Sequence, residues 1–120
     1  MILVDTSVWI DYLRVGDDEL ATLLNSTRVF THPFVIGELA CGNLHNRTEI
    51  LTLLADLPHV AVATDEEVLF FIEQHSLMGR GVGYIDAHLL ASASLTHPTQ
   101  LWTRDKRLNA LSTELELAYQ

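Results

Sequence analysis

The 120-residue sequence is poor in several features that would point to secretion or to a membrane. It has one cysteine, Cys41, so no disulfide can form within the chain, which suits a reducing compartment. No apolar run approaches the roughly 18 residues that a membrane-spanning helix needs. The N-terminus also lacks the basic and apolar regions of a secretory signal. We therefore expect a cytoplasmic protein.

Positive charge is scarce as well: seven Lys and Arg residues stand against sixteen Asp and Glu, a formal net charge of −9. A protein that binds nucleic acid by charge alone needs Lys and Arg to neutralise phosphates. Either the partner is not a polyanion, or it is a basic protein, or the acidic side chains surround cations that reverse the local charge. One group of basic residues, Arg104, Lys106 and Arg107, could still meet a phosphate.

The chain is long enough for one domain, residues 1–120, with a core that needs no disulfide or metal. Its 48% hydrophobic content agrees with a compact fold. Short apolar segments alternate with segments of helical pattern, which predicts an α/β fold with a mostly parallel sheet. We expect strands at 2–4, 28–33, 60–64 and 100–105, a possible last strand at 115–118, and helices at 6–13, 16–25, 33–43, 47–57, 64–78, 84–95 and 106–111.

Two of these strands end in a carboxylate with a hydroxyl beside it. Asp5 and Thr6 follow the first strand, and Thr103 and Asp105 lie at the end of the fourth. In open parallel sheets, binding sites form outside the carboxyl ends of the strands. These residues are therefore candidates for a site.

Two more acids, Glu38 and Asp86, lie among apolar neighbours on predicted helices. A half-buried carboxylate is costly unless it is paired or bound to a metal. If these two converge with Asp5 and Asp105, their mutual repulsion raises some pKa values unless a cation neutralises them. Mg²⁺ is held in proteins by a few carboxylates together with waters and substrate phosphate. The matching chemistry is metal-assisted phosphodiester hydrolysis, in which the cation also links an acidic protein to RNA.

Each acid also has a purely structural explanation. Asp5 could form a turn or cap the helix that follows it, and Asp105 could cap the last helix. Asp86 could interact favourably with the dipole at a helix N-terminus, and Glu38 could pair with an arginine. The spacing alone leaves these explanations and the four-acid site open.

Four segments carry a family resemblance: LVDTSVWIDYL, HPFVIGELACG, GVGYIDAHLLASA and LWTRDKRLNAL. Together they resemble the PIN-domain ribonucleases, and most closely the VapC-type toxins of bacterial toxin–antitoxin operons. The resemblance spans nearly the whole chain, in order, with one acid in each segment. A small departure is Leu108, where many PIN domains carry phenylalanine at a packing position.

The resemblance implies a three-layer α/β/α sandwich around a central, mostly parallel sheet. It implies a Mg²⁺- or Mn²⁺-dependent endoribonuclease. Metal-activated water would attack the phosphodiester, and because the scissile strand must be unpaired or bent to enter, we expect the substrate to be structured RNA, such as tRNA or rRNA. The resemblance also implies a cognate antitoxin, a homodimer and a larger toxin–antitoxin complex. Carried over residue by residue, the catalytic, metal-binding acids are Asp5, Glu38, Asp86 and Asp105, and hydroxyls at Thr6 or Ser7 and at Thr103 orient the carboxylates or metal waters.

The histidines and the remaining acids are not predicted to belong to a functional site. The six histidines include no pair at i and i+4, so a histidine-centred metal site is not favoured. Asp11 fits a solvated helix face, and the acids that begin at Asp17 and at Asp65 fit helix N-termini.

Alternative functions are a housekeeping PIN nuclease in RNA processing or DNA cleavage, a non-cleaving PIN-type binding module, and a receiver-type signalling domain. The non-cleaving module is expected where acids are lost. The receiver needs an aspartate after the third strand, which Thr64 and Asp65 satisfy only in part, and it needs a late lysine that is missing.

Overall fold

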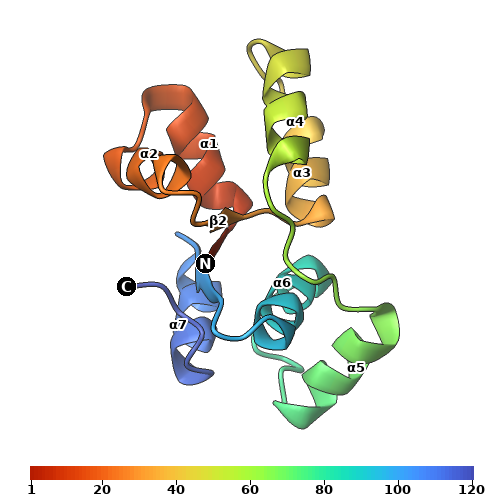
Figure 1. Ribbon diagram of the computed structural model, residues 1–120. Coiled ribbons are helices and arrows are strands. Elements are labelled where there is room, and N and C mark those ends of the chain that lie inside the picture. Colours follow the sequence, from red (N-terminus) through yellow and green to blue (C-terminus); the bar gives the residue numbers. More distant parts are fainter.

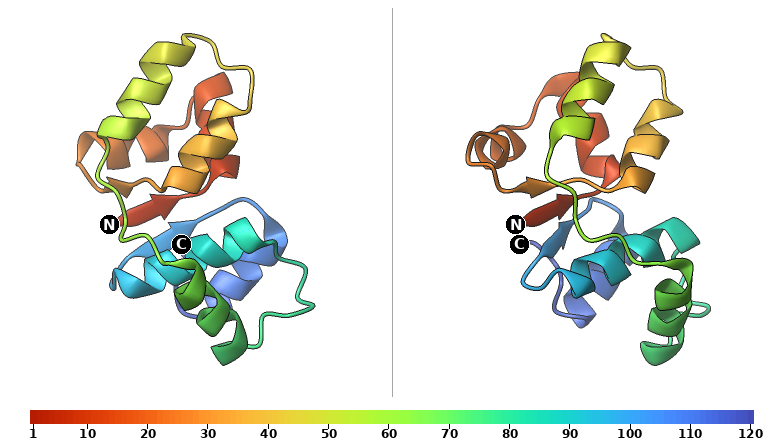
Figure 2. Two further views of the ribbon diagram at one scale, coloured as in Figure 1. Left: turned by 90° about the vertical axis from the view of Figure 1, so that its right-hand side faces the viewer. Right: turned by 45° about the vertical axis from the view of Figure 1, so that its right-hand side comes forward.

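A computed structural model describes all residues, 1–120, as three layers with a parallel sheet in the middle (Figure 1). The sheet has the strand order β2-β1-β3. Helices α1 to α4 lie on one side of the strands and α5 to α7 on the other, as the turned views show (Figure 2). The predicted α/β/α sandwich is therefore confirmed. The strands are β1 (Ile2–Val4), β2 (Val29–Phe30) and β3 (Gln100–Trp102).

All seven predicted helices are present, with small shifts at their ends. The sixth has the predicted bounds, whereas the first runs two residues further, to a break at Gly16 whose φ is 85°. The last helix extends three residues beyond its prediction. The helices are α1 (Thr6–Val15), α2 (Asp18–Asn25), α3 (Pro33–Ala40), α4 (Arg47–Asp56), α5 (Asp65–Gln74), α6 (Tyr84–Leu95) and α7 (Lys106–Glu114).

The central strand is β1, whose three residues are all buried. A strand covered by helices on both faces needs apolar side chains on both, which explains the unbroken Ile-Leu-Val run. In its register with β3, Val4 pairs with Trp102. The ladder continues one step further, because the Asp5 N–H donates to the Trp102 carbonyl at 2.9 Å. The residues after Val4 and Trp102 therefore emerge side by side at the carboxyl edge.

The prediction of a strand at 60–64 is wrong, and the segment predicted as a strand at 115–118 forms only a single bridge. The chain meets the sheet just before the first segment, through a bridge between Thr31 and His59. Beyond it, the Ala61 N–H donates at 3.2 Å to the hydroxyl of Thr96, the residue that follows α6, and the Ala63 N–H donates at 3.0 Å to the hydroxyl of Ser92 in α6. Hydroxyls thus replace the carbonyls that a neighbouring strand would supply. At the other edge only Ala118 bridges, to Leu101.

Helix α6 fills much of the layer below the sheet. Seven consecutive residues, from Ala87 to Ala93, are buried, and four of them are Ala or Ser, whose small side chains permit close packing. This packing fixes the start of α6, where Asp86 lies. None of the helices is both long and apolar enough to span a lipid bilayer.

Candidate active site

Asp5 is the most deeply placed acid of the predicted site, with 6% of its surface exposed. It occupies the N-cap position of α1, but its side chain caps nothing. Its Oδ2 atom instead accepts hydrogen bonds from Ser7 Oγ at 2.8 Å and from Thr103 Oγ1 at 2.7 Å. The explanation of Asp5 as a helix cap therefore does not describe this side chain, which is held by two hydroxyls from separate elements.

Glu38 projects from α3 and is exposed, so the expectation that it is half-buried was wrong. Val35 and Leu39 occupy the core face of this helix, and Glu38 lies away from that face. Its Oε1 atom accepts a hydrogen bond from Thr6 Oγ1 at 2.7 Å, and no arginine pairs with it. Thr6 and Ser7, which the sequence could not tell apart, thus contact different acids.

Asp86 lies in the first turn of α6 and is partly buried. The Gly83 N–H donates to its Oδ2 atom over a long 3.4 Å. Burial raises the pKa of the Asp86 carboxyl, and the negative charges of Asp5, Asp105 and Glu38 raise this pKa further. The fold therefore brings Asp5, Glu38 and Asp105 close enough for their charges to act on Asp86.

Asp105 is exposed at the N-cap of α7. Its Oδ1 atom accepts the Leu108 N–H at 2.9 Å, so the predicted capping role and a place beside the other acids coexist. Its own N–H donates to Thr103 Oγ1 at 3.1 Å. Thr103 therefore connects Asp105 with Asp5.

The four carboxylates share one pattern: in each, a single oxygen is hydrogen-bonded to the protein. The other oxygen has no partner within the chain and is available to a ligand. No three Asp, Glu, His or Cys side chains are arranged to hold one metal ion directly. Mg²⁺ usually takes one or two protein carboxylates and keeps several waters, so an all-oxygen set of donors fits it. The oxygens without partners are Oδ1 of Asp5, Oε2 of Glu38, Oδ1 of Asp86 and Oδ2 of Asp105.

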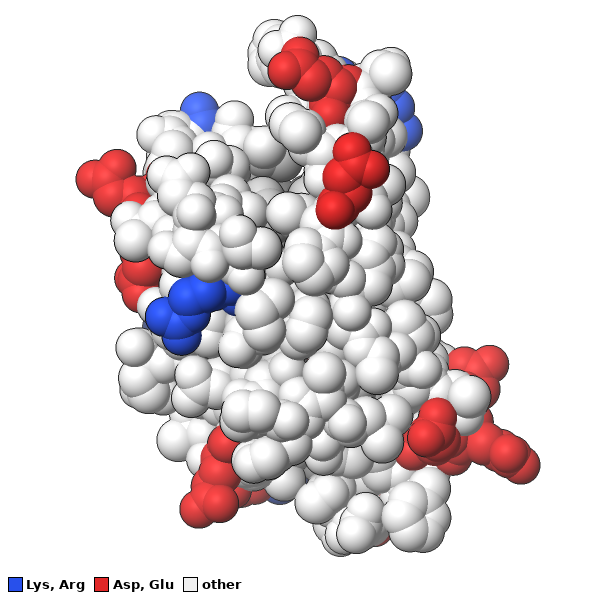
Figure 3. All heavy atoms as spheres, viewed as in Figure 1, with Lys and Arg blue, Asp and Glu red and all other residues white.

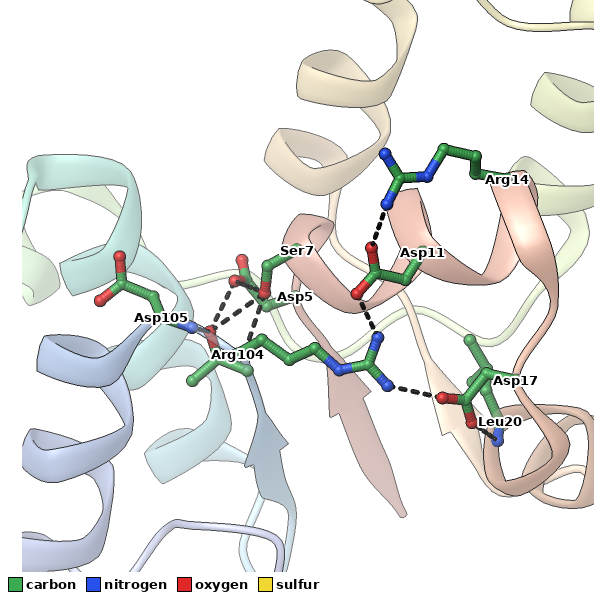
Figure 4. A network of polar contacts seen from close by, with 9 residues as sticks. Asp5, Ser7, Asp11, Arg14, Asp17, Leu20, Arg104 and Asp105 are labelled. Carbon is green, nitrogen blue, oxygen red and sulfur yellow. Dashed lines mark hydrogen bonds and ion pairs between the residues drawn. The ribbon is translucent and has the colours of Figure 1, made fainter.

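The three basic residues predicted near the site differ in their surroundings. Arg104 forms ion pairs with Asp11 and Asp17, as Figure 4 shows, although neither acid had been predicted to have a partner. Lys106 and Arg107 are exposed in the first turn of α7 and form no ion pair. Sequence reasoning missed the Arg104 contacts because they join residues 87 and 93 positions apart.

A second missed contact joins α5 to the start of α6. Asp65 Oδ1 accepts a hydrogen bond from Tyr84 Oη at 3.0 Å and lies 3.1 Å from His88 Nε2. The helix-dipole explanation of Asp65 is therefore incomplete. Tyr84 and His88 flank Asp86 in the chain, so this contact ties the turn that carries Asp86 to the neighbouring helix.

Comparison with known proteins identifies the family of this chain. The model of the PIN domain family matches residues 2–114. The chain belongs to the PIN-domain family. This PIN domain is 48% identical over 118 residues to Ribonuclease VapC32 of Mycobacterium tuberculosis, in strains CDC 1551 / Oshkosh and ATCC 25618 / H37Rv. The alignment covers 98% of this chain and 95% of the relative. The resemblance to VapC-type PIN domains is therefore confirmed.

The fold is also shared with a solved structure, FitAcB from Neisseria gonorrhoeae. The TM-score is 0.65, with 98% of this PIN domain and 95% of that chain covered. The two are 22% identical, so this likeness concerns the fold.

Proposed function

We propose that this PIN domain is the endoribonuclease toxin of a toxin–antitoxin pair and cleaves RNA with Mg²⁺, or Mn²⁺, held by Asp5, Glu38, Asp86 and Asp105. The class of enzyme follows from the family and from the 48% identity to a ribonuclease. The metal, the residues that bind it, the substrate and the partners are the proposed part. All four acids are present, which favours a cleaving enzyme over a binding module.

One observation carries this proposal: the charges of three carboxylates act on a fourth, Asp86, and each of the four keeps one oxygen free of protein contacts. Such mutual repulsion is costly without a cation between the charges. A bound divalent cation would supply the chemistry, since it polarises a phosphoryl oxygen and makes a nearby water more acidic.

Three hydroxyl groups orient the proposed metal-binding carboxylates. Ser7 and Thr103 fix the Oδ2 atom of Asp5, so its Oδ1 atom has a defined direction. Thr6 does the same for Glu38. Hydroxyl groups that orient carboxylate ligands are a common supporting layer of metal sites.

Lys106 and Arg107 are the proposed RNA contacts. They are exposed beside Asp105 at the start of α7, and neither is neutralised by an ion pair. Phosphate contacts of this kind position the nucleic acid without reading its sequence. The scissile strand must be unpaired to enter, so we propose loops of structured RNA, such as tRNA or rRNA, as the substrate.

A cavity beside Glu38 supports the proposal of an antitoxin. It has a volume of about 460 Å³ and lies between α1, α3 and the start of α4, with Ile10, Leu39 and Ile50 in its wall. Because Glu38 also lines it, an apolar antitoxin segment bound there could extend a basic side chain to the carboxylates. Such a segment would block the site and neutralise it.

A second surface supports a homodimer. Leu69 and Phe70 of α5 are 58% and 67% exposed, and Leu95 of α6, which is 53% exposed, lies beside Phe70. The face of the molecule in Figure 3 is largely uncharged, with acidic side chains gathered at its edges, including a group over α5. We propose that a second copy covers this apolar area, and that toxin and antitoxin form a larger complex in the cytoplasm.

Cleavage of RNA by the purified protein, separated from antitoxin, tests the proposed function. We expect cleavage with Mg²⁺ or Mn²⁺, none in EDTA, and a loss of at least about 100-fold in Asp5→Asn with an unchanged circular dichroism spectrum. Asp56→Asn, an exposed carboxylate at the end of α4, is the matched control and should cleave normally. Full activity in EDTA or in Asp5→Asn would contradict the proposal.

A further inference from the structure

We infer that Arg104 is a positioning residue: its guanidinium, held between Asp11 and Asp17, fixes the segment from Thr103 to Asp105 against α1 and so keeps the site's carboxylates in place. This inference rests on the proposed function, because it concerns the same metal site. It differs from the sequence-based interpretation, in which Arg104 contacts RNA.

The guanidinium of Arg104 spans two acids on separate elements. Its Nη1 atom lies 2.5 Å from Asp11 Oδ2, and its Nη2 atom lies 2.5 Å from Asp17 Oδ2. Asp11 belongs to the middle of α1, whereas Asp17 is the N-cap of α2, with Oδ1 bound to the Leu20 N–H at 2.9 Å. Asp17 thus uses one oxygen to start a helix and the other to hold Arg104.

The backbone of the same residue reaches the site. The Arg104 N–H donates to Ser7 Oγ at 3.0 Å, and Ser7 Oγ donates to Asp5 Oδ2. Figure 4 shows this unbroken path from Asp17 through Arg104 and Ser7 to Asp5. One residue therefore connects the α1–α2 layer, the end of β3 and the deepest carboxylate of the site.

The carboxylates of Asp11 and Asp17 occupy the guanidinium of Arg104, so it is not free to bind RNA. Hydrogen bonds to Asp17 and Asp11 raise the pKa of the guanidinium. The Leu20 N–H lowers the pKa of Asp17, and Arg104 lowers it further despite partial desolvation. A phosphate would have to displace two carboxylates from this guanidinium, whereas Lys106 and Arg107 beside it face no such competition.

The two acids require the geometry of arginine. A planar guanidinium presents N–H groups in a fixed fork, so separate nitrogens bond the two carboxylates at once. A lysine ammonium is a point charge on a flexible stem and does not hold both partners in one defined geometry. Arg104→Lys keeps the positive charge but loses the contact with both carboxylates at once. This variant therefore distinguishes a positioning role of Arg104 from an effect of its charge alone.

The test compares Mn²⁺ binding, measured by calorimetry, with the kcat and KM of RNA cleavage and with thermal unfolding. The variants are Arg104→Ala, Arg104→Lys and the double variant Asp11→Asn/Asp17→Asn. Asparagine keeps the Leu20 contact, because it is as good an N-cap as aspartate. Exposed ion pairs contribute little to stability, so all variants should fold. The matched control is Arg80→Ala, which removes another two-bond arginine pair, with Glu114.

We expect 10- to 100-fold weaker Mn²⁺ binding and a lower kcat in Arg104→Ala and in the double variant, the range found for residues that orient metal ligands. KM for RNA should stay unchanged, Arg104→Lys should recover only part of the loss, and Arg80→Ala should match the native protein.

Native Mn²⁺ affinity in Arg104→Ala, with a higher KM instead, would overturn the inference in favour of an RNA contact. In that case the double variant would free Arg104 and lower KM. Absence of Mn²⁺ binding by the native protein would overturn both the proposed function and this inference. Native binding that the variants leave unchanged would overturn the inference alone.

Discussion

Thr103 Oγ1 lies 2.7 Å from Asp5 Oδ2, although 98 positions separate the two residues. The parallel register of β1 and β3 produces this contact, because Val4 pairs with Trp102 and the next residue of each strand emerges at the same edge. Three buried apolar residues hold β1 in the middle of the sheet. The position of Asp5 is therefore set by the core, and its orientation by a hydroxyl from the neighbouring strand.

Thr103→Val should weaken metal binding by about 10- to 100-fold, because Asp5 loses one of the two hydroxyls that orient it. The Asp105 N–H also loses its acceptor, which should lower the unfolding free energy by about 1 kcal/mol. Mn²⁺ calorimetry and chemical denaturation measure the two effects. Thr103→Ser keeps the hydroxyl and should retain native affinity, so an equal loss in both variants would contradict this role.

The sequence alone sufficed for the helices and the central strand, whereas the choice of the four acids rested on the family resemblance and stays a prediction. The signals of these elements are local: apolar residues at helical spacing and the unbroken apolar run of β1. Asp5 and Asp105 stand out because they follow strands, whereas Glu38 and Asp86 lie on helices. The partners of Thr6, Ser7 and Arg104 could not be predicted, because they are set by tertiary packing between distant segments. The strand expected at 60–64 failed for a related reason, since the hydroxyls of Ser92 in α6 and of Thr96 just after it accept hydrogen bonds from its backbone.

Asp86→Asn should make the metal-free protein more stable while it abolishes metal binding. Burial and neighbouring charges raise the pKa of Asp86 in the folded state, so its ionised form is disfavoured there. Between the ordinary aspartate value and this raised pKa, the folded state binds more protons, so stability falls as pH rises and stays lower at neutral pH. Removing the charge removes this cost.

Thermal unfolding in EDTA measures the stability of the metal-free protein, and unfolding in Mg²⁺ measures the stabilisation by bound metal. The native protein should gain stability on adding Mg²⁺, and Asp86→Asn should not. A lower melting temperature for Asp86→Asn in EDTA would contradict the proposed repulsion among the four acids.

The free energy of unfolding should fall as the pH falls from about 6.5 to 4, because His32 is buried in its neutral form. It is fully buried, and its Nδ1 atom accepts the Phe34 N–H at 3.0 Å at the start of α3. Burial, with further contributions from His88 and His59, lowers the pKa of His32 to about 4. The unfolded chain therefore takes up a proton in this window that the folded state does not, and stability rises with pH across it.

Denaturant unfolding at several pH values tests this. The contribution of His32 should be up to about 1.4 kcal/mol for each pH unit within the window, and it should disappear in His32→Asn, which keeps an acceptor for the Phe34 N–H. His45→Asn, at an exposed position, should leave the slope unchanged. An unaltered slope in His32→Asn would show that another group is responsible.

Phe70→Glu should convert the proposed homodimer into a monomer. Phe70 is 67% exposed beside Leu69 and Leu95, and a carboxylate placed there would have to be desolvated when a second copy covers the patch. Light scattering after gel filtration gives the mass at several concentrations. Val15→Glu is the control, because Val15 is 77% exposed at the end of α1, outside this patch. If both variants keep the native mass, the interface lies elsewhere or the protein is a monomer, and the α5–α6 surface needs another explanation.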